Sequence, residues 1–175
     1  MITLITGGAR SGKSRHALEL AMKYKKRVFI ATAESMDKEM DERIARHKAE
    51  RGDAFTTIEE PLNPAEALKK IPAGTEVALI DCLTLWTGNL MHKHGEDTDS
   101  FKEADQFLSA LDSLQCDIII VTNEVGMGIV PDNSFARKYR DVAGRINQRV
   151  AARADKVTLV VCGVPVTVKA PGGLS

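Results

Sequence analysis

A glycine-rich octapeptide near the amino terminus constrains this chain more than any other feature. Residues 7–14 read GGARSGKS and fit the pattern G-x-x-x-x-G-K-[ST], in which backbone N–H groups, a lysine and a hydroxyl surround phosphate oxygens. The stretch follows the apolar run Ile2–Thr6 and opens a helical pattern at about Lys13. A helix that begins there directs the positive end of its dipole toward the same anion. The sequence therefore predicts a nucleoside triphosphate site, with Lys13 on the β- and γ-phosphates and Ser14 on Mg²⁺.

Strand-like and helical stretches alternate along the chain, which favours an α/β fold with a mainly parallel sheet. Strands are expected at Ile2–Thr6, Arg27–Ala31, Phe55–Ile58, Val77–Asp81, Asp117–Thr122, Lys156–Cys162 and Val164–Lys169. Helices are expected at about Lys13–Tyr24, Asp37–Arg51, Ala65–Lys70, Leu83–His92, Phe101–Leu114 and Asn133–Ala154. The last two strands flank Gly163 and are expected to form an antiparallel hairpin at one edge. With no linker or repeat, residues 1–175 are expected to form a single domain.

Composition excludes several classes of protein. Lys and Arg total 24 and balance 24 Asp and Glu, so there is no overall charge to attract nucleic acid or an anionic membrane. No apolar run reaches the ~18–20 residues that span a bilayer, and the first residues lack the basic region of a signal peptide. Cys82, Cys116 and Cys162 are odd in number and lie in apolar contexts, so we expect reduced core thiols in a cytoplasmic protein.

Acidic side chains follow two of the expected strands. Asp81 ends the run VALID and is the candidate carboxylate on the Mg²⁺ side of the nucleotide; the alternative is that it only caps the next helix. Asn123 and Glu124 follow the next strand, in the loop TNEVGMG, and are the rival to Asp81. Because ligands of open α/β sheets lie at the carboxyl ends of strands, Glu124 is a candidate for substrate binding or acid–base work, with a structural turn as the alternative.

Four histidines occur, and His47 is the one with catalytic potential. It continues the apolar stripe of Met40 and Ile44, which is typical of a core histidine. Its neighbours include Arg43, Arg46, Lys48 and Arg51, which suit anionic phosphates. Nearby cations also depress the pKa of an imidazole and favour its nucleophilic neutral form. Both interpretations stay open on this evidence.

Three other features favour structural roles. The H-x-H pair His92 and His94 lacks a third ligand at a suitable spacing and is typical of a solvated helix end. Trp86 is expected in the core or at an interface. Arg10 and Arg15 lie near the phosphate loop, where phosphate contact and plain solvent exposure are equally compatible with the sequence.

Longer strings resemble one known family over essentially the whole chain. They are GGARSGKSRHA at 7–17, IATAE at 30–34, DERIARHKAER at 41–51, VTNEVGMGIVP at 121–131 and RDVAGRINQRVAARADKV at 140–157. These strings are similar to the bifunctional adenosylcobinamide kinase / adenosylcobinamide-phosphate guanylyltransferases of cobalamin biosynthesis. The resemblance implies a P-loop NTPase fold with a RecA-like sheet, and a homotrimer with sites near subunit interfaces.

The resemblance also implies two reactions. ATP or GTP phosphorylates the aminopropanol hydroxyl of adenosylcobinamide, and then a histidine carries GMP from GTP to adenosylcobinamide phosphate, which gives adenosylcobinamide-GDP. The guanylylated histidine falls on His47, and Lys13 is the other implied catalytic residue. The implied nucleotide contacts are Gly7, Gly8, Ala9, Arg10, Ser11, Gly12, Lys13, Ser14, Ala31, Thr32, Ala33, Lys48, Ala49, Glu50, Arg51, Glu59 and Asp81.

Two other functions fit the residues. A P-loop small-molecule kinase would use Lys13, Ser14 and Asp81 and leave His47 structural. A non-enzymatic, nucleotide-gated RecA-like module would bind nucleotide without either transfer, although the balanced charge and the lack of a partner-binding tail count against it.

Overall fold

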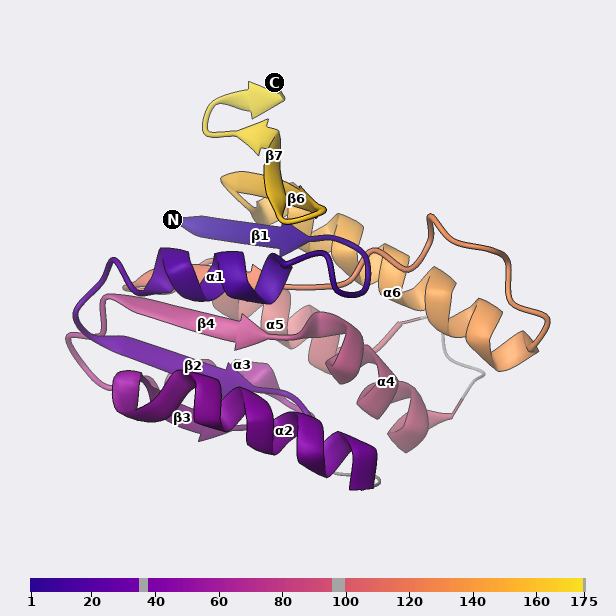
Figure 1. The fold of residues 1–175 in the computed structure, drawn as a ribbon, viewed down its shortest axis with the longest axis horizontal. Coiled ribbons are helices and arrows are strands. Elements are labelled where there is room, and N and C mark those ends of the chain that lie inside the picture. Colours follow the sequence, from indigo (N-terminus) through magenta and orange to yellow (C-terminus); the bar gives the residue numbers. More distant parts are fainter. Residues whose placement is uncertain (35–37, 96–99, 175) are drawn as a thin grey trace.

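The protein is described here by a computed structural model that covers residues 1–34, 38–95 and 100–174. Its centre is an eight-stranded sheet in the order β3-β2-β4-β5-β1-β6-β7-β8 (Figure 1). The strands are β1 (Ile2–Thr6), β2 (Arg27–Ala31), β3 (Thr56–Glu59), β4 (Val77–Asp81), β5 (Asp117–Val121), β6 (Lys156–Val161), β7 (Val164–Ala170) and β8 (Gly173–Leu174). The expected bounds of β1, β2 and β4 are confirmed to the residue.

Strand pairing confirms the mainly parallel sheet. The pairs β2–β3, β2–β4, β4–β5, β1–β5 and β1–β6 are all parallel. The pairs β6–β7 and β7–β8 are antiparallel, so the carboxyl-terminal hairpin is confirmed and gains a short strand that the sequence did not indicate. Parallel strands point their carboxyl ends to one edge, and the residues that follow them therefore meet there.

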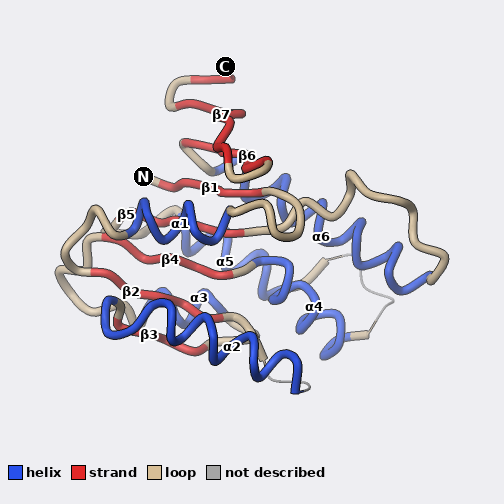
Figure 2. Tube along the Cα trace, in the orientation of Figure 1, coloured by secondary structure: helices blue, strands red, loops and turns tan. Residues whose placement is uncertain are grey.

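Helices cover both faces of the sheet (Figure 2). They are α1 (Lys13–Ala21), α2 (Lys38–Arg51), α3 (Pro64–Lys69), α4 (Leu83–His94), α5 (Lys102–Leu111) and α6 (Ser134–Arg153), with a 3₁₀ turn η1 (Gly52–Ala54). Apolar residues of α3 to α6 pack with one face of the central strands, and α1 packs on the other. α2 lies on the α1 side, where Arg51 covers the ring of Phe29.

Two helices end earlier than the sequence indicated, for the same reason. Beyond α1, the N–H groups of Lys23 and Tyr24 bond to carbonyls three residues back, and beyond α5 those of Asp112 and Ser113 do likewise. This tighter bonding ends the α-helix in a turn. By contrast, α4 runs two residues longer than expected and stops at Gly95, whose φ is +83°.

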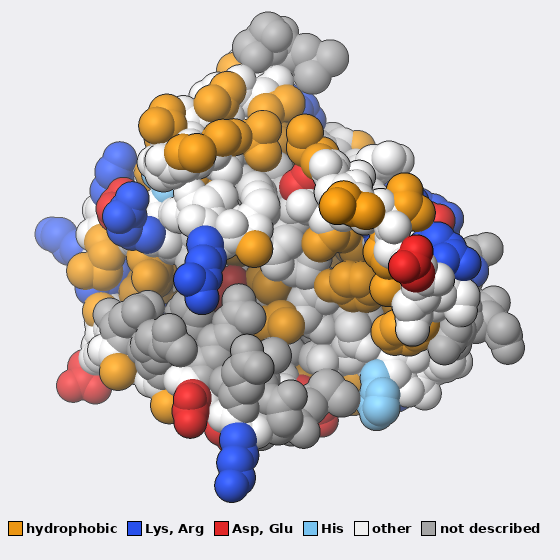
Figure 3. Space-filling view, turned by 45° about the vertical axis from the view of Figure 1, so that its right-hand side comes forward, with side chains coloured by type: hydrophobic (Ala, Val, Ile, Leu, Met, Phe, Trp, Pro, Cys, Tyr) orange, Lys and Arg blue, Asp and Glu red, His pale blue; other side chains and the backbone are white. Residues whose placement is uncertain are grey.

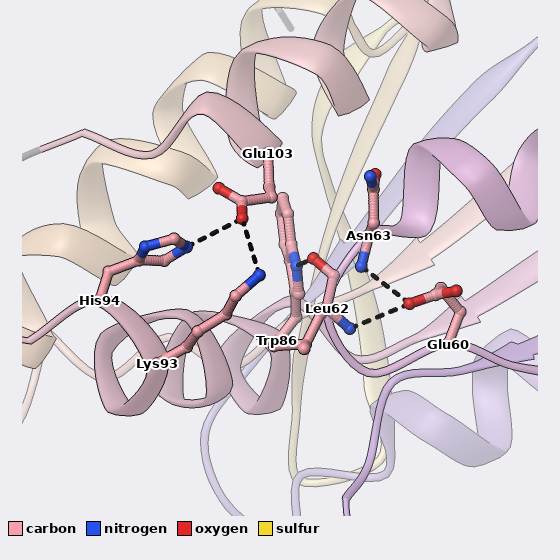
Figure 4. Close-up of polar contacts among 7 residues, drawn as sticks. All are labelled: Glu60, Leu62, Asn63, Trp86, Lys93, His94 and Glu103. Atoms are coloured by element: carbon pink, nitrogen blue, oxygen red, sulfur yellow. Dashed lines mark hydrogen bonds and ion pairs between the residues drawn. The ribbon is translucent and has the colours of Figure 1, made fainter.

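The burial of Trp86 agrees with the sequence-based expectation, whereas the exposure of one of the three cysteines does not. Trp86 is fully buried, and its indole N–H donates to the carbonyl of Leu62 at 2.9 Å (Figure 4), so the core interpretation is confirmed. All three cysteines are free. Cys82 is buried and Cys116 half-buried, but Cys162 is exposed because it forms the β6–β7 turn with φ +52°. The expectation of a core thiol is wrong for Cys162.

Candidate active site

The loop of residues 7–14 connects β1 to α1 and packs too closely for a side chain at Gly7 or Gly12. A Cβ on Gly7 would lie 2.5 Å from the carbonyl oxygen of Val160. Gly12 is the N-cap of α1 with φ +93°, and a Cβ there would lie 3.2 Å from Cα of Gly163. Lys13 is only 8% exposed, and its Nζ donates to the carbonyl of Gly8 at 3.0 Å. The ammonium therefore lies across the loop, as expected for a phosphate-binding loop.

A cleft of about 360 Å³ lies beside this loop at the carboxyl ends of the strands. Lys13 and Ser14 line it from α1, and Asp81 lines it from the end of β4. β2 pairs with β4 so that Ala31 is opposite Asp81, which brings the end of β2 to the same place. A serine hydroxyl and a carboxylate are hard oxygen donors of the kind that Mg²⁺ binds, so these residues fit the ion. Asp81 thus faces the cleft, besides preceding α4.

One side of the cleft, which we name the charged wall, consists of Phe29, Asp41, Lys48, Arg51 and Glu59. Lys48 Nζ lies 2.6 Å from Glu59 Oε1 and pairs α2 with β3. The Arg51 guanidinium lies 3.6 Å from the centroid of the Phe29 ring, a cation–π contact. Burial lowers the pKa of Arg51, while Asp81 and Glu59 act in the opposite sense. The guanidinium remains charged because an arginine pKa starts far above neutrality.

The opposite side, which we name the neutral wall, consists of Cys82, Thr84, Leu85, Asn123 and Tyr139. It comes from the start of α4, the end of β5 and α6. Burial raises the pKa of the Cys82 thiol, which therefore stays protonated and is a poor nucleophile. Burial also raises the pKa of Tyr139 to about 12, so its hydroxyl is un-ionised at neutral pH.

The structure gathers part of the predicted set in this cleft. Eight predicted residues line it: Lys13, Ser14, Ala31, Ala33, Lys48, Arg51, Glu59 and Asp81. Thr32 lies beneath it, fully buried, with its hydroxyl accepting from Cys82 N at 2.8 Å and donating to Cys82 O at 2.9 Å. Ala49 is exposed on α2 and does not line the cleft. His47 and Glu50 lie in α2, but the structure describes only their backbone and not their side chains.

Glu124 lines a second cleft, of about 650 Å³, between the loop after β5 and α6. Its carboxylate accepts from the N–H of Gly126 at 2.9 Å, which stabilises a local turn. Its own N–H donates to the carbonyl of Gly7 at 3.1 Å, so the residue also contacts the phosphate loop. The structural role proposed as the alternative is thus present, and the acid–base role stays a prediction.

The H-x-H pair lies at the exposed end of α4, as the sequence indicated. His94 Nε2 is 2.8 Å from Glu103 Oε1, and Lys93 Nζ is 3.3 Å from the same oxygen (Figure 4). These contacts connect α4 to α5. Within residues 1–34, 38–95 and 100–174, no group of three or more His, Cys, Asp or Glu side chains is arranged to hold a metal ion.

Sequence reasoning missed most of the neutral wall. Thr84 and Leu85 come within four residues of Asp81, so their place just beyond the end of β4 was a usable signal. Tyr139 lies inside the expected helix Asn133–Ala154 without a signal of its own, because periodicity alone does not distinguish a core residue from one at the mouth of a cleft. Phe29 was likewise a strand residue without a marked role.

Fold and cleft together define a nucleotide-binding protein of the P-loop NTPase class. Solved structures of that general shape include an ATPase from the type III secretion system of pathogenic bacteria, with TM-score 0.55 and 12% identity, covering 95% of this chain and 56% of that one. The RadB recombinase gives TM-score 0.50 and 14% identity, covering 90% and 73%. At such identities the likeness shows the fold alone. No helix in the described ranges is long and apolar enough to cross a membrane.

The sequence comparisons are more specific. The model of the family "Cobinamide kinase / cobinamide phosphate guanyltransferase" matches residues 3–168. Bifunctional adenosylcobalamin biosynthesis protein CobU of Escherichia coli (strain K12) is 39% identical over 181 residues, covering 97% of this chain and all of that protein. The corresponding CobP of Pseudomonas aeruginosa is 43% identical over 171 residues, covering 97% and 98%. The chain therefore belongs to the cobinamide kinase / cobinamide phosphate guanyltransferase family.

Proposed function

We propose that this chain catalyses two successive reactions on cobinamide: phosphorylation by ATP or GTP, and transfer of GMP from GTP to the resulting phosphate. The observation that carries the proposal is the meeting of Lys13, Ser14 and Asp81 with the charged wall in one cleft. Such a cleft supplies the positioning and charge neutralisation that phosphoryl transfer mainly requires. The family membership of the chain supports both activities.

In the kinase step, the hydroxyl oxygen of the aminopropanol arm forms a bond to the γ-phosphorus. The bond from that phosphorus to the β–γ bridging oxygen breaks, and ADP or GDP leaves. Lys13 neutralises charge on the β- and γ-phosphates. Ser14 and Asp81 would hold a Mg²⁺ ion, which would supply further positive charge beside these phosphates. Glu124 is our candidate to receive the hydroxyl proton, for which its carboxylate must exchange the Gly126 N–H for the substrate hydroxyl.

In the second step, an imidazole nitrogen of His47 forms a bond to the α-phosphorus of GTP, and pyrophosphate leaves with the electrons of the broken P–O bond. The imidazole loses its proton and carries GMP as a phosphoramidate. A phosphate oxygen of cobinamide phosphate then attacks the same phosphorus and frees the histidine, which gives the GDP derivative. Covalent catalysis divides one difficult transfer into two displacements.

The protein is proposed to act as a closed oligomer, a homotrimer by family resemblance. One face suits such assembly: Val161, Val164, Val166 and Val168 are 43% to 60% exposed on the hairpin of β6 and β7. Figure 3 shows hydrophobic side chains gathered at this end of the molecule. Closed symmetry is the common arrangement of soluble oligomers. Sedimentation equilibrium that yields only a 19.1 kDa species at micromolar concentration overturns the oligomer.

Incubation with GTP labelled separately at the α and γ positions tests the function. We expect α label to stay on the protein as an acid-labile, comparatively base-stable adduct, and γ label to leave with pyrophosphate. Addition of cobinamide should move γ label onto the hydroxyl of the arm. A kinase without nucleotidyl transfer gives γ transfer but no α label on the protein. A nucleotide-gated module binds GTP and gives neither.

A further inference from the structure

The two sides of the cleft differ in charge. The charged wall carries Asp41, Lys48, Arg51 and Glu59, whereas the neutral wall consists of a thiol, a threonine, a leucine, an asparagine and a tyrosine. Phosphates bind most favourably to cations and charge-assisted donors. A nucleotide is therefore expected along the loop and the charged wall, which leaves the neutral wall for an uncharged ligand.

Hydrogen bonds hold the neutral wall in one arrangement. Tyr139 donates from its hydroxyl to the carbonyl of Thr84 at 3.0 Å, which joins α6 to α4. Asn123 donates from Nδ2 to Thr84 Oγ1 at 2.7 Å, and the backbone carbonyl of Asn123 accepts from Asn147 Nδ2 at 3.2 Å. Thr84 Oγ1 also lies 3.0 Å from Cys82 Sγ. Side chains fixed in this way can orient a ligand without a further ordering cost.

These bonds leave two oxygens able to accept hydrogen bonds from a ligand. The Tyr139 hydroxyl donates its proton to Thr84 and keeps its lone pairs. Asn123 uses its amide nitrogen, which leaves Oδ1 as an acceptor. Leu85, half-buried beside them, offers an apolar surface. Two acceptors and one apolar side chain match a short aliphatic arm that bears an amide N–H and a hydroxyl.

The neutral wall also lies where an acceptor has to approach. β5 runs between β4 and β1, so Asn123 follows the strand that separates Asp81 from the phosphate loop. In phosphoryl transfer, the attacking and leaving oxygens lie on opposite sides of the transferred phosphorus. A nucleotide bound from the charged wall requires its acceptor on the other side.

We propose that the neutral wall is the acceptor subsite. In the bound substrate, Asn123 Oδ1 accepts from the hydroxyl of the aminopropanol arm until that proton passes to Glu124, and Tyr139 Oη accepts from the amide N–H of the arm. The inference rests on the proposed function, since it names the substrate held at that same site. Tyr139 and Asn123 are then residues that determine affinity for cobinamide and not for nucleotide.

Tyr139→Phe and Asn123→Ala test the subsite. In each variant we expect the KM for cobinamide in the kinase assay to rise about five- to tenfold, since one uncharged hydrogen bond is lost. The Kd of GTP, measured by titration calorimetry, should stay within about twofold, which also shows that the variant is folded. Tyr24→Phe is the matched control, because this second tyrosine bonds to Asp117 at the start of β5, at the opposite edge of the sheet. The control should leave both constants unchanged.

The outcomes separate the subsite from the function beneath it. An unchanged KM for cobinamide in both variants, in a chain whose wild type phosphorylates cobinamide, overturns the subsite alone. A higher Kd for GTP with an unchanged KM for cobinamide assigns the neutral wall to the guanine base, and this result also overturns the acceptor subsite. A wild type that binds GTP but never phosphorylates cobinamide removes the proposed function, and the acceptor subsite with it.

Discussion

The charged and neutral walls face the same cleft but are built on different principles. The charged wall is joined across elements by the ion pair of Lys48 with Glu59 and by the cation–π contact of Arg51 with the Phe29 ring. The neutral wall is joined by uncharged hydrogen bonds of Thr84 with Asn123 and Tyr139. The comparison suggests a way for one site to keep two reactants apart. In the proposed arrangement, the nucleotide phosphates bind along the cationic side chains of the charged wall, and the uncharged arm of the acceptor binds along the neutral wall.

The largest effect that the comparison predicts is at His47, on the helix of the charged wall. His47→Asn should abolish the protein-bound GMP and the guanylyl transfer, because no other group is proposed to attack the α-phosphorus. Direct transfer of the γ-phosphate needs no such intermediate, so the kinase rate should largely persist. Acid-quenched assays with α-labelled GTP measure the first and cobinamide phosphorylation the second. GMP that still accumulates on the variant places the nucleophile elsewhere, with His16, His92 and His94 to examine.

The next largest effect is expected at Lys13, which serves both walls. Lys13→Ala should lower both activities by about two to three decades, since loss of a preorganised charge contact costs ~3–4 kcal/mol in the transition state. The two rates are measured separately on variant protein whose folding is checked by circular dichroism. Near-normal turnover in both assays by a folded variant contradicts the assignment of the phosphate loop.

The residues of the charged wall were easier to predict from the sequence than those of the neutral wall. The phosphate loop and the buried strand at Ile118–Ile120 were predictable, because a glycine-rich loop and a run of consecutive β-branched residues are each typical of one kind of local structure. The charged residues of α2 were visible as a cluster. Tyr139 was not, since its role depends on α6 crossing next to α4, and such packing between distant elements leaves no local pattern. Glu124 was noticed, but its side chain lines the second cleft because the Gly126 N–H captures it.

A smaller effect tests the charged wall directly. Arg51→Gln should weaken the Kd of GTP roughly ten- to a hundredfold, which corresponds to one charge-assisted hydrogen bond of about 1.5–3 kcal/mol. The KM for cobinamide should remain unchanged if the walls act separately. Arg149→Gln is the control, because that arginine pairs with Asp105 between α6 and α5 and does not line the cleft. Equal losses of GTP and cobinamide affinity in Arg51→Gln contradict the division between the walls.

The smallest effect concerns the loop that both walls share. Gly163, at the tip of the β6–β7 hairpin, donates from its N–H to the Ser11 carbonyl at 2.8 Å, and its φ is +81°. A Cβ there would lie 3.3 Å from Arg15 Nη2. Gly163→Ala should therefore strain the hairpin by ~1–2 kcal/mol and shift the loop that it contacts.

Because the phosphate loop adjoins both walls, we expect Gly163→Ala to weaken GTP binding severalfold and to lower both reaction rates in proportion. Gly172→Ala is the matched control: Gly172 has φ +98°, so alanine is strained there too, but nothing lies within 4 Å of its added Cβ. Thermal melts should show both variants destabilised, whereas calorimetry with GTP should distinguish them. Equal GTP affinity in the two variants means that the hairpin does not position the loop. A loss confined to one reaction means that the hairpin acts on one wall and not on the loop between them.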